Sequence, residues 1–273
     1  VMATFKVTKG TPVAFRDSTY PTASPSPNEG ELFYNSSSGA FQFIGIATGA
    51  WSSGGNLGTA RQSGAGLGIQ TASLFVAGET GSILDLVENY NGTSWSEVAE
   101  VNTARKANTA LGTTSAGLTA GGASGPPAAF QTLNELWNGT GWSESADLTT
   151  GRNALSSAGT TTAGLAFAGI VSTGESATNE SWNGTSWSEV ADVNTARNNG
   201  TGGGTSTSAI LAGGLTTAPL AITETWNGTS WTEVSDLNSA RSQTGGTAES
   251  STNSVIFGGR TPPGADTVNT ESW

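Results

Sequence analysis

A repeat of about 45 residues is the feature of this sequence that most limits what the chain can fold into. In each full repeat, an aromatic residue is followed by Asn-Gly-Thr and then by a Trp. The four copies of this pair are Tyr90 and Trp95, Trp137 and Trp142, Trp182 and Trp187, and Trp226 and Trp231. An Arg stands ten positions after each second Trp, and the pair Trp51 and Arg61 keeps that spacing. Such a period indicates similar units stacked side by side, each sharing a core with its neighbours.

Each repeat is predicted to contain four short strands. In the fourth full repeat they fall within Gly203–Ser208, Ala209–Ala212, Ala221–Trp226 and Ser230–Val234. Asn227-Gly228 between the last two predicts a tight type I′ turn, which needs positive φ at both central residues. Helical periodicity is missing throughout. Four strands in each period of 40 to 45 residues are typical of a β-propeller blade.

The two ends of the repeat region are expected to complete each other. Glu271-Ser272-Trp273 matches a third strand, whereas Gly49-Ala50-Trp51 matches a fourth strand that no other three precede. Joining them would pair a sheet edge that otherwise stays open. We therefore predict an all-β, five-bladed propeller over residues 49–273, whose N- and C-terminal strands close the last blade. The blades are expected at residues 57–98, 101–145, 148–190, 193–234, and 237–273 completed by 49–54.

Residues 1–48 do not fit the repeat and are predicted to form an N-terminal arm. Thr4–Thr8 alternates like a strand, Pro21–Pro27 resembles an extended linker, and Leu32–Tyr34 with Phe41–Ile44 resembles a hairpin. Val1–Gly10 lacks the apolar segment of a signal peptide. Two interpretations stay open for the arm: a flexible segment packed on the propeller, or an attachment arm that docks onto a larger assembly.

The residues that recur in every repeat are interpreted as structural. Both aromatics of each pair are expected to lie in the core between neighbouring sheets, the alternative being a set of platforms that stack on sugars. A Glu stands two positions before each first aromatic, which suggests a fixed Arg–Glu pair in every blade, or alternatively a ring of Arg that binds an anion in the central channel. These structural positions are Trp51, Trp95, Trp142, Trp187, Trp231, Arg61, Arg105, Arg152, Arg197, Arg241, Glu88, Glu135, Glu180, Glu224 and Glu271.

Further acidic residues recur on the strands and links and are expected to form a solvated acidic rim. They are Glu97, Glu144, Glu189, Glu233, Glu100, Asp147, Asp192 and Asp236. Their spacing does not match a calcium-binding loop, so no metal site is expected. The Asn-Gly-Thr segments are formal glycosylation sequences, although their role in a turn is sufficient to explain them.

Composition excludes several kinds of chemistry. The chain has no His and no Cys, which removes the most common general base and the most common transition-metal ligands. Its net charge of −11 argues against nucleic acid and against an anionic membrane as partners. Acids that recur in every repeat point to architecture, because an active site is built once. We therefore expect no catalytic residues and no cofactor.

Residues that differ between repeats are the candidates for recognition. They lie in the loops that follow the second strand of each blade, where we expect any partner to bind. The candidate binding residues are Pro126, Pro127, Phe130, Arg260, Pro262 and Pro263.

The repeat resembles the kelch repeat of galactose oxidase-type propellers. The resemblance rests on apolar stretches ending in Gly-Gly, as at Gly121-Gly122 and Gly213-Gly214, on the aromatic pair, and on the downstream Arg. It covers roughly residues 49–273 and implies a kelch-type propeller, although Gly78-Glu79 and Gly169-Ile170 lack the second Gly.

The amino-acid sequence of the repeat, and the segment Asn28–Gly39, also resemble structural proteins of marine tailed phages. This resemblance implies a non-enzymatic structural or adhesive component of a phage virion, located in the extracellular particle. Its partners would be other virion proteins, copies of itself, or a glycan or protein of the host surface. The alternative is a secreted, multivalent carbohydrate-binding propeller, and a hydrolase is the weakest interpretation.

Overall fold

The computed structural model describes residues 4–5, 13–14, 32–35, 40–43, 53–125 and 129–273. The chain forms two compact units, Val1–Ser53 and Gly54–Trp273. In the first unit, β1 (Thr4–Phe5) pairs with β2 (Val13–Ala14), and β3 (Leu32–Asn35) pairs with β4 (Ala40–Phe43). The second pair confirms the predicted hairpin, whereas the predicted Pro-rich linker lies outside the described residues.

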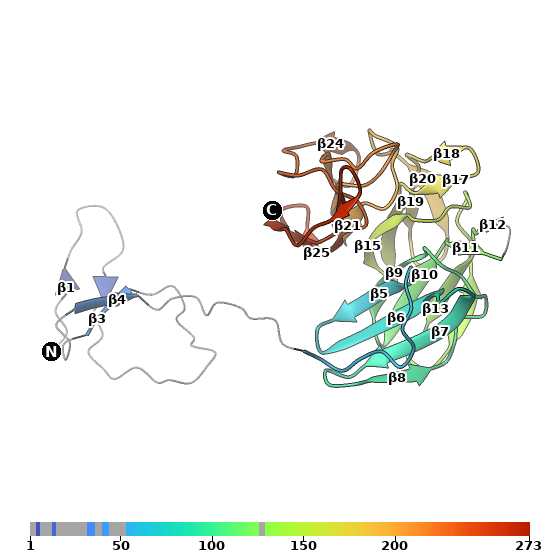
Figure 1. Ribbon diagram of the computed structural model, residues 1–273, viewed down its shortest axis with the longest axis horizontal. Helices are drawn as coiled ribbons and strands as arrows, with labels where there is room; N and C mark the ends of the chain where they lie inside the picture. Colours follow the sequence, from blue (N-terminus) through green and yellow to red (C-terminus); the bar gives the residue numbers. More distant parts are fainter. Residues whose placement is uncertain (1–3, 6–12, 15–31, 36–39, 44–52, 126–128) are drawn as a thin grey trace. The chain divides into compact units, whose positions relative to one another are not determined.

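The second unit is a five-bladed β-propeller, as the repeat predicts (Figure 1). Each blade is one antiparallel sheet whose strands follow the chain order from the central channel outward. In these parts of the chain every element is a strand, and no helix suited to crossing a membrane is found. The blades are β5 (Ala65–Ile69), β6 (Ala72–Glu79), β7 (Ile83–Tyr90) and β8 (Trp95–Val98); β9 (Thr109–Thr113), β10 (Ala116–Ala120), β13 (Asn134–Trp137) and β14 (Trp142–Ser145); β15 (Ser156–Thr160), β16 (Ala163–Phe167), β19 (Asn179–Trp182) and β20 (Trp187–Val190); β21 (Thr201–Thr205), β22 (Ser208–Ala212), β23 (Thr223–Trp226) and β24 (Trp231–Glu233); and β25 (Gly245–Ser250), β26 (Asn253–Phe257) and β29 (Thr270–Ser272).

The described part of the fifth blade has three strands, in the order β25, β26, β29. Of the predicted closing segment 49–54, residues 49–52 lie outside the described residues. Ser53 and Gly54 belong to no strand.

The aromatic pairs of the second, third and fourth blades lie between blades, which confirms the predicted place in the core for these three pairs. Trp226 and Trp231 of the fourth blade share a buried cluster with Leu165 and Phe167 of the third. Trp182 and Trp187 pack in the same way on Leu118 of the second blade. Each indole that is buried in this way removes a large apolar area from water, so the contact between blades is a main source of stability.

The inner strand of the fourth blade corrects the sequence prediction. It covers Thr201–Thr205 and not Gly203–Ser208. A Cβ added at Gly203 would lie 2.8 Å from the Cβ of Ala248 in the next inner strand. The strands around the channel approach so closely that Gly replaces the β-branched residues by which a strand is normally recognised.

The Asn-Gly turns are also built differently from the prediction. Among the described residues only the Gly of each turn has positive φ, for example Gly184 at 94°, whereas Asn183 does not. Instead, Asn183 Oδ1 accepts hydrogen bonds from the backbone N–H groups of Thr185 and Ser186, both at 2.9 Å. The turn is therefore a four-residue loop closed by an Asn side chain and not a two-residue type I′ turn.

Backbone hydrogen bonds connect the blades in succession around the channel. The N–H of Ala107 donates to Ser63 O at 2.7 Å, and the N–H of Ala154 donates to Ala107 O at 2.8 Å. Asn199 and Gln243 continue the series, each at 3.0 Å. All five residues stand two positions after the repeated Arg and have φ between 50° and 60°. The positive φ turns each backbone toward the neighbouring blade, at some conformational cost.

Candidate functional site on the loop face

The five repeated Arg residues form ion pairs with the five repeated Glu residues, as their spacing predicted. In the third blade, Arg152 Nη2 lies 3.0 Å from Glu180 Oε1, and both side chains are fully buried. The four other pairs join Arg61 to Glu88, Arg105 to Glu135, Arg197 to Glu224 and Arg241 to Glu271.

Each pair fixes the point at which a blade's second strand ends and its loop begins. Arg152 donates from Nη2 to Ala166 O and from Nη1 to Thr178 O, both at 2.8 Å. Glu180 Oε2 accepts a hydrogen bond at 2.7 Å from the N–H of Thr149, which lies in the link between β14 of the second blade and β15 of the third. One buried pair therefore holds the link, the second strand and the third strand together, and it sets where the intervening loop starts.

Burial and pairing act against each other in these groups. Burial lowers the pKa of Arg105, Arg152 and Arg197, while their Glu partners oppose that shift. Burial raises the pKa of Glu88, but hydrogen bonds from the Gly58 N–H and from Arg61 outweigh it, so the pKa lies below its ordinary value. A hydrogen-bonded carboxylate beside a guanidinium is stabilised in its charged form.

The alternative of an anion-binding Arg ring is wrong. The channel cavity, of about 440 Å³, is lined by the starts of the inner strands, mostly Gly, Ala, Ser and Thr, and by no Arg. The repeated guanidinium groups are instead enclosed within their own blades, where the carboxylates hold them. The alternative of sugar platforms fails at five Trp side chains that are buried between blades: Trp137, Trp182, Trp187, Trp226 and Trp231.

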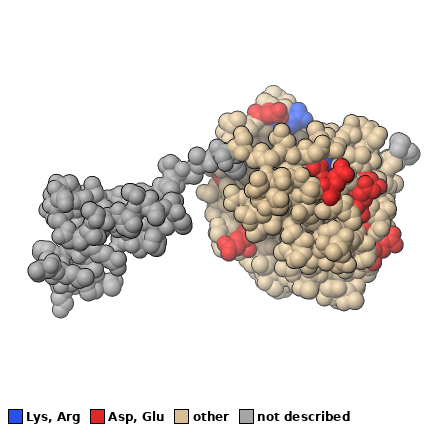
Figure 2. Space-filling view, turned by 90° about the horizontal axis from the view of Figure 1, so that it is seen from below, with Lys and Arg blue, Asp and Glu red and all other residues tan. Residues whose placement is uncertain are grey.

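The exposed charges are mainly acidic (Figure 2). The acidic residues of the predicted rim, such as Glu97, Glu144 and Asp192, are exposed. Of the basic residues in the described part of the chain, Lys106 and Arg260 lie outside the repeated pairs, and Lys106 Nζ contacts Glu79 Oε2 at 2.6 Å. A search of the described residues finds no group of three acids placed to hold a metal ion.

The loops after the second strands gather at one end of the propeller, which we call the loop face. Because successive strands are antiparallel, the Asn-Gly turns lie at the opposite end, the turn face. Three loops form two-stranded ribbons that sequence reasoning missed, because their strands have only two residues each. They are β11 (Ala123–Ser124) with β12 (Ala129–Phe130), β17 (Ile170–Val171) with β18 (Gly174–Glu175), and β27 (Arg260–Thr261) with β28 (Ala265–Asp266).

A cleft of about 310 Å³ opens on the loop face between the fourth and fifth blades. One wall is the loop Leu215–Pro219, and the other is the loop Arg260–Gly264. Arg260 Nη2 donates to Gly264 O at 3.0 Å, and Arg260 Nε lies 3.5 Å from Asp266 Oδ1. The cleft thus combines proline and aliphatic surface with one exposed guanidinium.

The structure brings three of the six predicted binding residues to this cleft: Arg260, Pro262 and Pro263. Phe130 lies in β12 of the second blade, away from it. Pro126 and Pro127 lie outside the described residues. The opposite wall, with Leu215 and Pro219, was signalled only by its position after a second strand.

Comparisons with known proteins support the fold alone. No protein-family model matches the chain, and no curated protein sequence matches it. Among solved structures, that of YjhT aligns with a TM-score of 0.67 at 14% sequence identity. The alignment covers 78% of this chain and 81% of that one. At this identity the likeness extends to the propeller architecture and not to activity.

Proposed function

We propose that this chain is a non-enzymatic structural or adhesive protein of a phage virion, whose propeller is a scaffold that presents the loop face to a partner. The partner would be another virion protein, a second copy of the chain, or the host surface. The proposal rests on the resemblance of the repeat sequence and of Asn28–Gly39 to phage structural proteins. It also rests on the distribution of repeated and unrepeated residues over the molecule.

The observation that carries the proposal is the cleft between Leu215–Pro219 and Arg260–Gly264. Its walls belong to loops that follow second strands, where the sequence differs between blades, whereas the repeated Arg and Glu are enclosed in ion pairs. A contact surface that mixes apolar side chains with Arg is typical of the centre of a protein interface. The acidic surface around it favours a partner that is not itself strongly acidic.

Quantitative mass spectrometry of purified particles tests this function. If the proposal is right, particles of the phage that encodes the chain contain it at a fixed copy number relative to the major capsid protein. Its absence from the particles, with the free protein in the lysate, would contradict the proposal.

A secreted lectin is the alternative. Because the five Trp side chains named above are buried, the loop-face cleft is where we would expect such a lectin to bind sugar. We expect a glycan array to show no saturable binding by the purified protein. Strong binding that Arg260→Ala abolishes would favour the lectin instead.

A further inference from the structure

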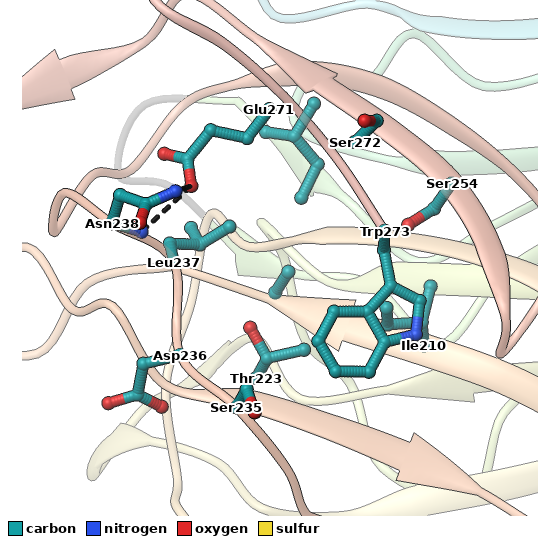
Figure 3. A pocket seen from close by; sticks show the side chains of 12 residues that line it. Ile210, Thr223, Ser235, Asp236, Leu237, Asn238, Ser254, Glu271, Ser272 and Trp273 are labelled. Carbon is teal, nitrogen blue, oxygen red and sulfur yellow. Dashed lines mark hydrogen bonds between the residues drawn. The ribbon is translucent and has the colours of Figure 1, made fainter.

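The two cavities between the fourth and fifth blades are lined by side chains of opposite charge. The cavity beside Trp273, of about 200 Å³, is lined by Asp236 and Glu271 and, among the described residues, by no basic side chain (Figure 3). The loop-face cleft, of about 310 Å³, is lined by Arg260 and by no acidic side chain of the described residues. On a propeller whose exposed charges are mainly acidic, the cleft is therefore a local site of positive charge.

The guanidinium of Arg260 is only partly engaged by the protein. Its Nη2 donates to Gly264 O at 3.0 Å, and its Nε lies 3.5 Å from Asp266 Oδ1. Its Nη1 has no hydrogen-bond partner in the described part of the chain. Because a guanidinium carries five N–H donors, the outer edge formed by Nη1 and by the second N–H of Nη2 is available to a carboxylate.

Arg260 differs in this respect from the other basic residues that the structure describes. The repeated Arg side chains are fully buried against their Glu partners. Lys106 Nζ lies 2.6 Å from Glu79 Oε2, and the Lys106 side chain is 31% exposed. The ion pair of Arg260 is the longest of those between described residues, and its side chain is 54% exposed. Arg260 is therefore the basic group that is most available to a carboxylate from outside.

Backbone hydrogen bonds fix both walls of the cleft before any partner binds. The N–H of Arg260 donates to Ser242 O at 2.9 Å, and the N–H of Ser242 donates to Arg260 O at 3.0 Å. On the opposite wall, the N–H of Leu215 donates to Asn198 O at 2.7 Å, and the N–H of Asn198 returns the bond at 3.0 Å. A site that is held in place in this way loses little conformational freedom on binding.

We propose that the cleft binds a segment of the partner through one carboxylate, an Asp or Glu side chain that pairs with Arg260. An apolar side chain next to that carboxylate would lie between Leu215–Pro219 and Pro262–Pro263. Gln243, which is exposed and also lines the cleft, supplies an amide that can bond to the backbone of the segment. This inference rests on the proposed function, because it names the part of the partner that the loop face recognises.

The surroundings of the cleft limit the segment to a single carboxylate. A run of acidic residues would be repelled by the acidic surface of the propeller, whereas one carboxylate can be compensated by Arg260. Charge complementarity at one point, beside apolar contacts, is therefore what the cleft offers to a partner.

Asp266 is expected to compete with the partner for the same guanidinium. Its side chain is 90% exposed, and an exposed ion pair of 3.5 Å is weak. Removal of its charge should strengthen binding, whereas removal of the guanidinium should weaken it. Two opposite effects from neighbouring residues would separate recognition of a charge from general damage to the loop.

Selection from a displayed library of random octapeptides on the full-length protein tests the class of partner. We expect the enriched peptides to contain one Asp or Glu next to an apolar residue, and to lose binding to Arg260→Ala. Enriched peptides without an acidic residue, enriched peptides that bind Arg260→Ala equally well, or no enrichment over a blank surface would each overturn the proposal.

A matched pair of synthetic peptides then measures the contribution of the carboxylate. One is the best enriched peptide, and the other carries the corresponding amide, Gln or Asn, in place of its acidic residue. Calorimetric titration of the natural protein should show at least about fivefold weaker binding of the amide peptide. Equal affinity for the two peptides would contradict the proposal.

Three variants, each checked for folding by thermal unfolding, assign that contribution to Arg260. Arg260→Ala should bind the two peptides equally, and Asp266→Asn should bind the acidic peptide about twofold or more tightly than the natural protein does. Lys106→Ala, the matched control for loss of a basic side chain, should bind as the natural protein does. Weaker binding by Lys106→Ala, or unchanged binding by Asp266→Asn, would show that general charge and not the Arg260 site attracts the peptide.

The peptide measurements and the particle measurement can fail separately. If particles contain the chain at a fixed copy number but the peptides show no preference for a carboxylate, the inference about the cleft is wrong and the virion role stands. If the peptides behave as expected but the chain is absent from particles, the virion role is wrong and the specificity of the cleft stands.

Discussion

At the scale of single residues, the molecule depends on charges that are buried in pairs. Moving an Arg and a Glu out of water is costly, and their mutual attraction repays that cost only when further hydrogen bonds satisfy both groups. The pair of Arg152 and Glu180 meets this condition through the carbonyls of Ala166 and Thr178 and through the N–H of Thr149.

Removing one member of this pair should leave an uncompensated buried charge. We expect Glu180→Gln to lower the free energy of unfolding by about 3–5 kcal/mol, measured by urea denaturation. The control is Asp266→Asn, which removes an exposed carboxylate 3.5 Å from Arg260 and should cost less than about 1 kcal/mol. Equal losses in the two variants would show that the buried pairs are not structural.

The pH dependence of stability should reveal Glu88. Its pKa in the folded protein lies below the ordinary value of 4.5, because hydrogen bonds from the Gly58 N–H and Arg61 outweigh burial. The stabilisation from Glu88 is therefore fully present above about pH 4.5 and is lost as the pH falls through the lower folded-state pKa.

Urea denaturation of the natural protein and Glu88→Gln, followed from pH 7 to pH 3, measures this contribution. The difference in free energy of unfolding between the two proteins should be constant at neutral pH and should shrink below about pH 4.5. A difference that grows on acidification would have the wrong sign for a lowered pKa.

At the scale of elements, the Asn-Gly turns hold the third and fourth strands in register. We expect Asn183→Ala to lose about 1 kcal/mol of stability, because it removes the acceptor of the Thr185 and Ser186 N–H groups. Thermal unfolding measures the effect. Asn183→Asp keeps the oxygen acceptor and should lie closer to the natural protein. If both variants lost the same stability, the side-chain oxygen would not be what closes the loop.

Sequence and structure agree where the structural role of a position requires one particular type of residue. The repeat of about 45 residues sufficed to predict the blades, and the repeated Arg, with the Glu two positions before each first aromatic, sufficed to predict the ion pairs. The inner strand Thr201–Thr205 was misplaced because close approach of neighbouring backbones selects Gly, which carries no strand signal. The ribbons of the loop face were missed because two-residue strands have no periodicity to detect.

The candidate site was predictable only in part for a related reason. Arg260, Pro262 and Pro263 were found because they depart from the repeat, but a cleft needs two walls. The loop of the second wall, Leu215–Pro219, follows a second strand as expected of a binding loop, but only the structure shows that it faces Arg260–Gly264. Which loops become neighbours is a property of the ring and not of any local pattern.

At the scale of the whole molecule, two sets of residues do different work. The repeated aromatic, Arg, Glu and Asn residues build and join the blades. The unrepeated loops, which do not hold the blades together, surround one end of the channel and form the cleft. This division is the central claim of the proposed function, and it predicts that stability and partner binding can be changed separately.

The separation of stability from partner binding is tested most directly by complementation of a phage from which the gene for this chain is deleted. Two variants are compared for folding, by thermal unfolding, and for incorporation into particles. One is Arg260→Ala with Pro263→Ala on the loop face, and the other is Thr185→Ala with Thr229→Ala, two exposed threonines on the turn face. We predict that both variants fold with stabilities within about 1 kcal/mol of the natural protein. The loop-face variant should be incorporated into particles at least about tenfold less than the natural protein. The turn-face variant should be incorporated normally. Normal incorporation of the loop-face variant, or loss of the turn-face variant, would contradict the claim.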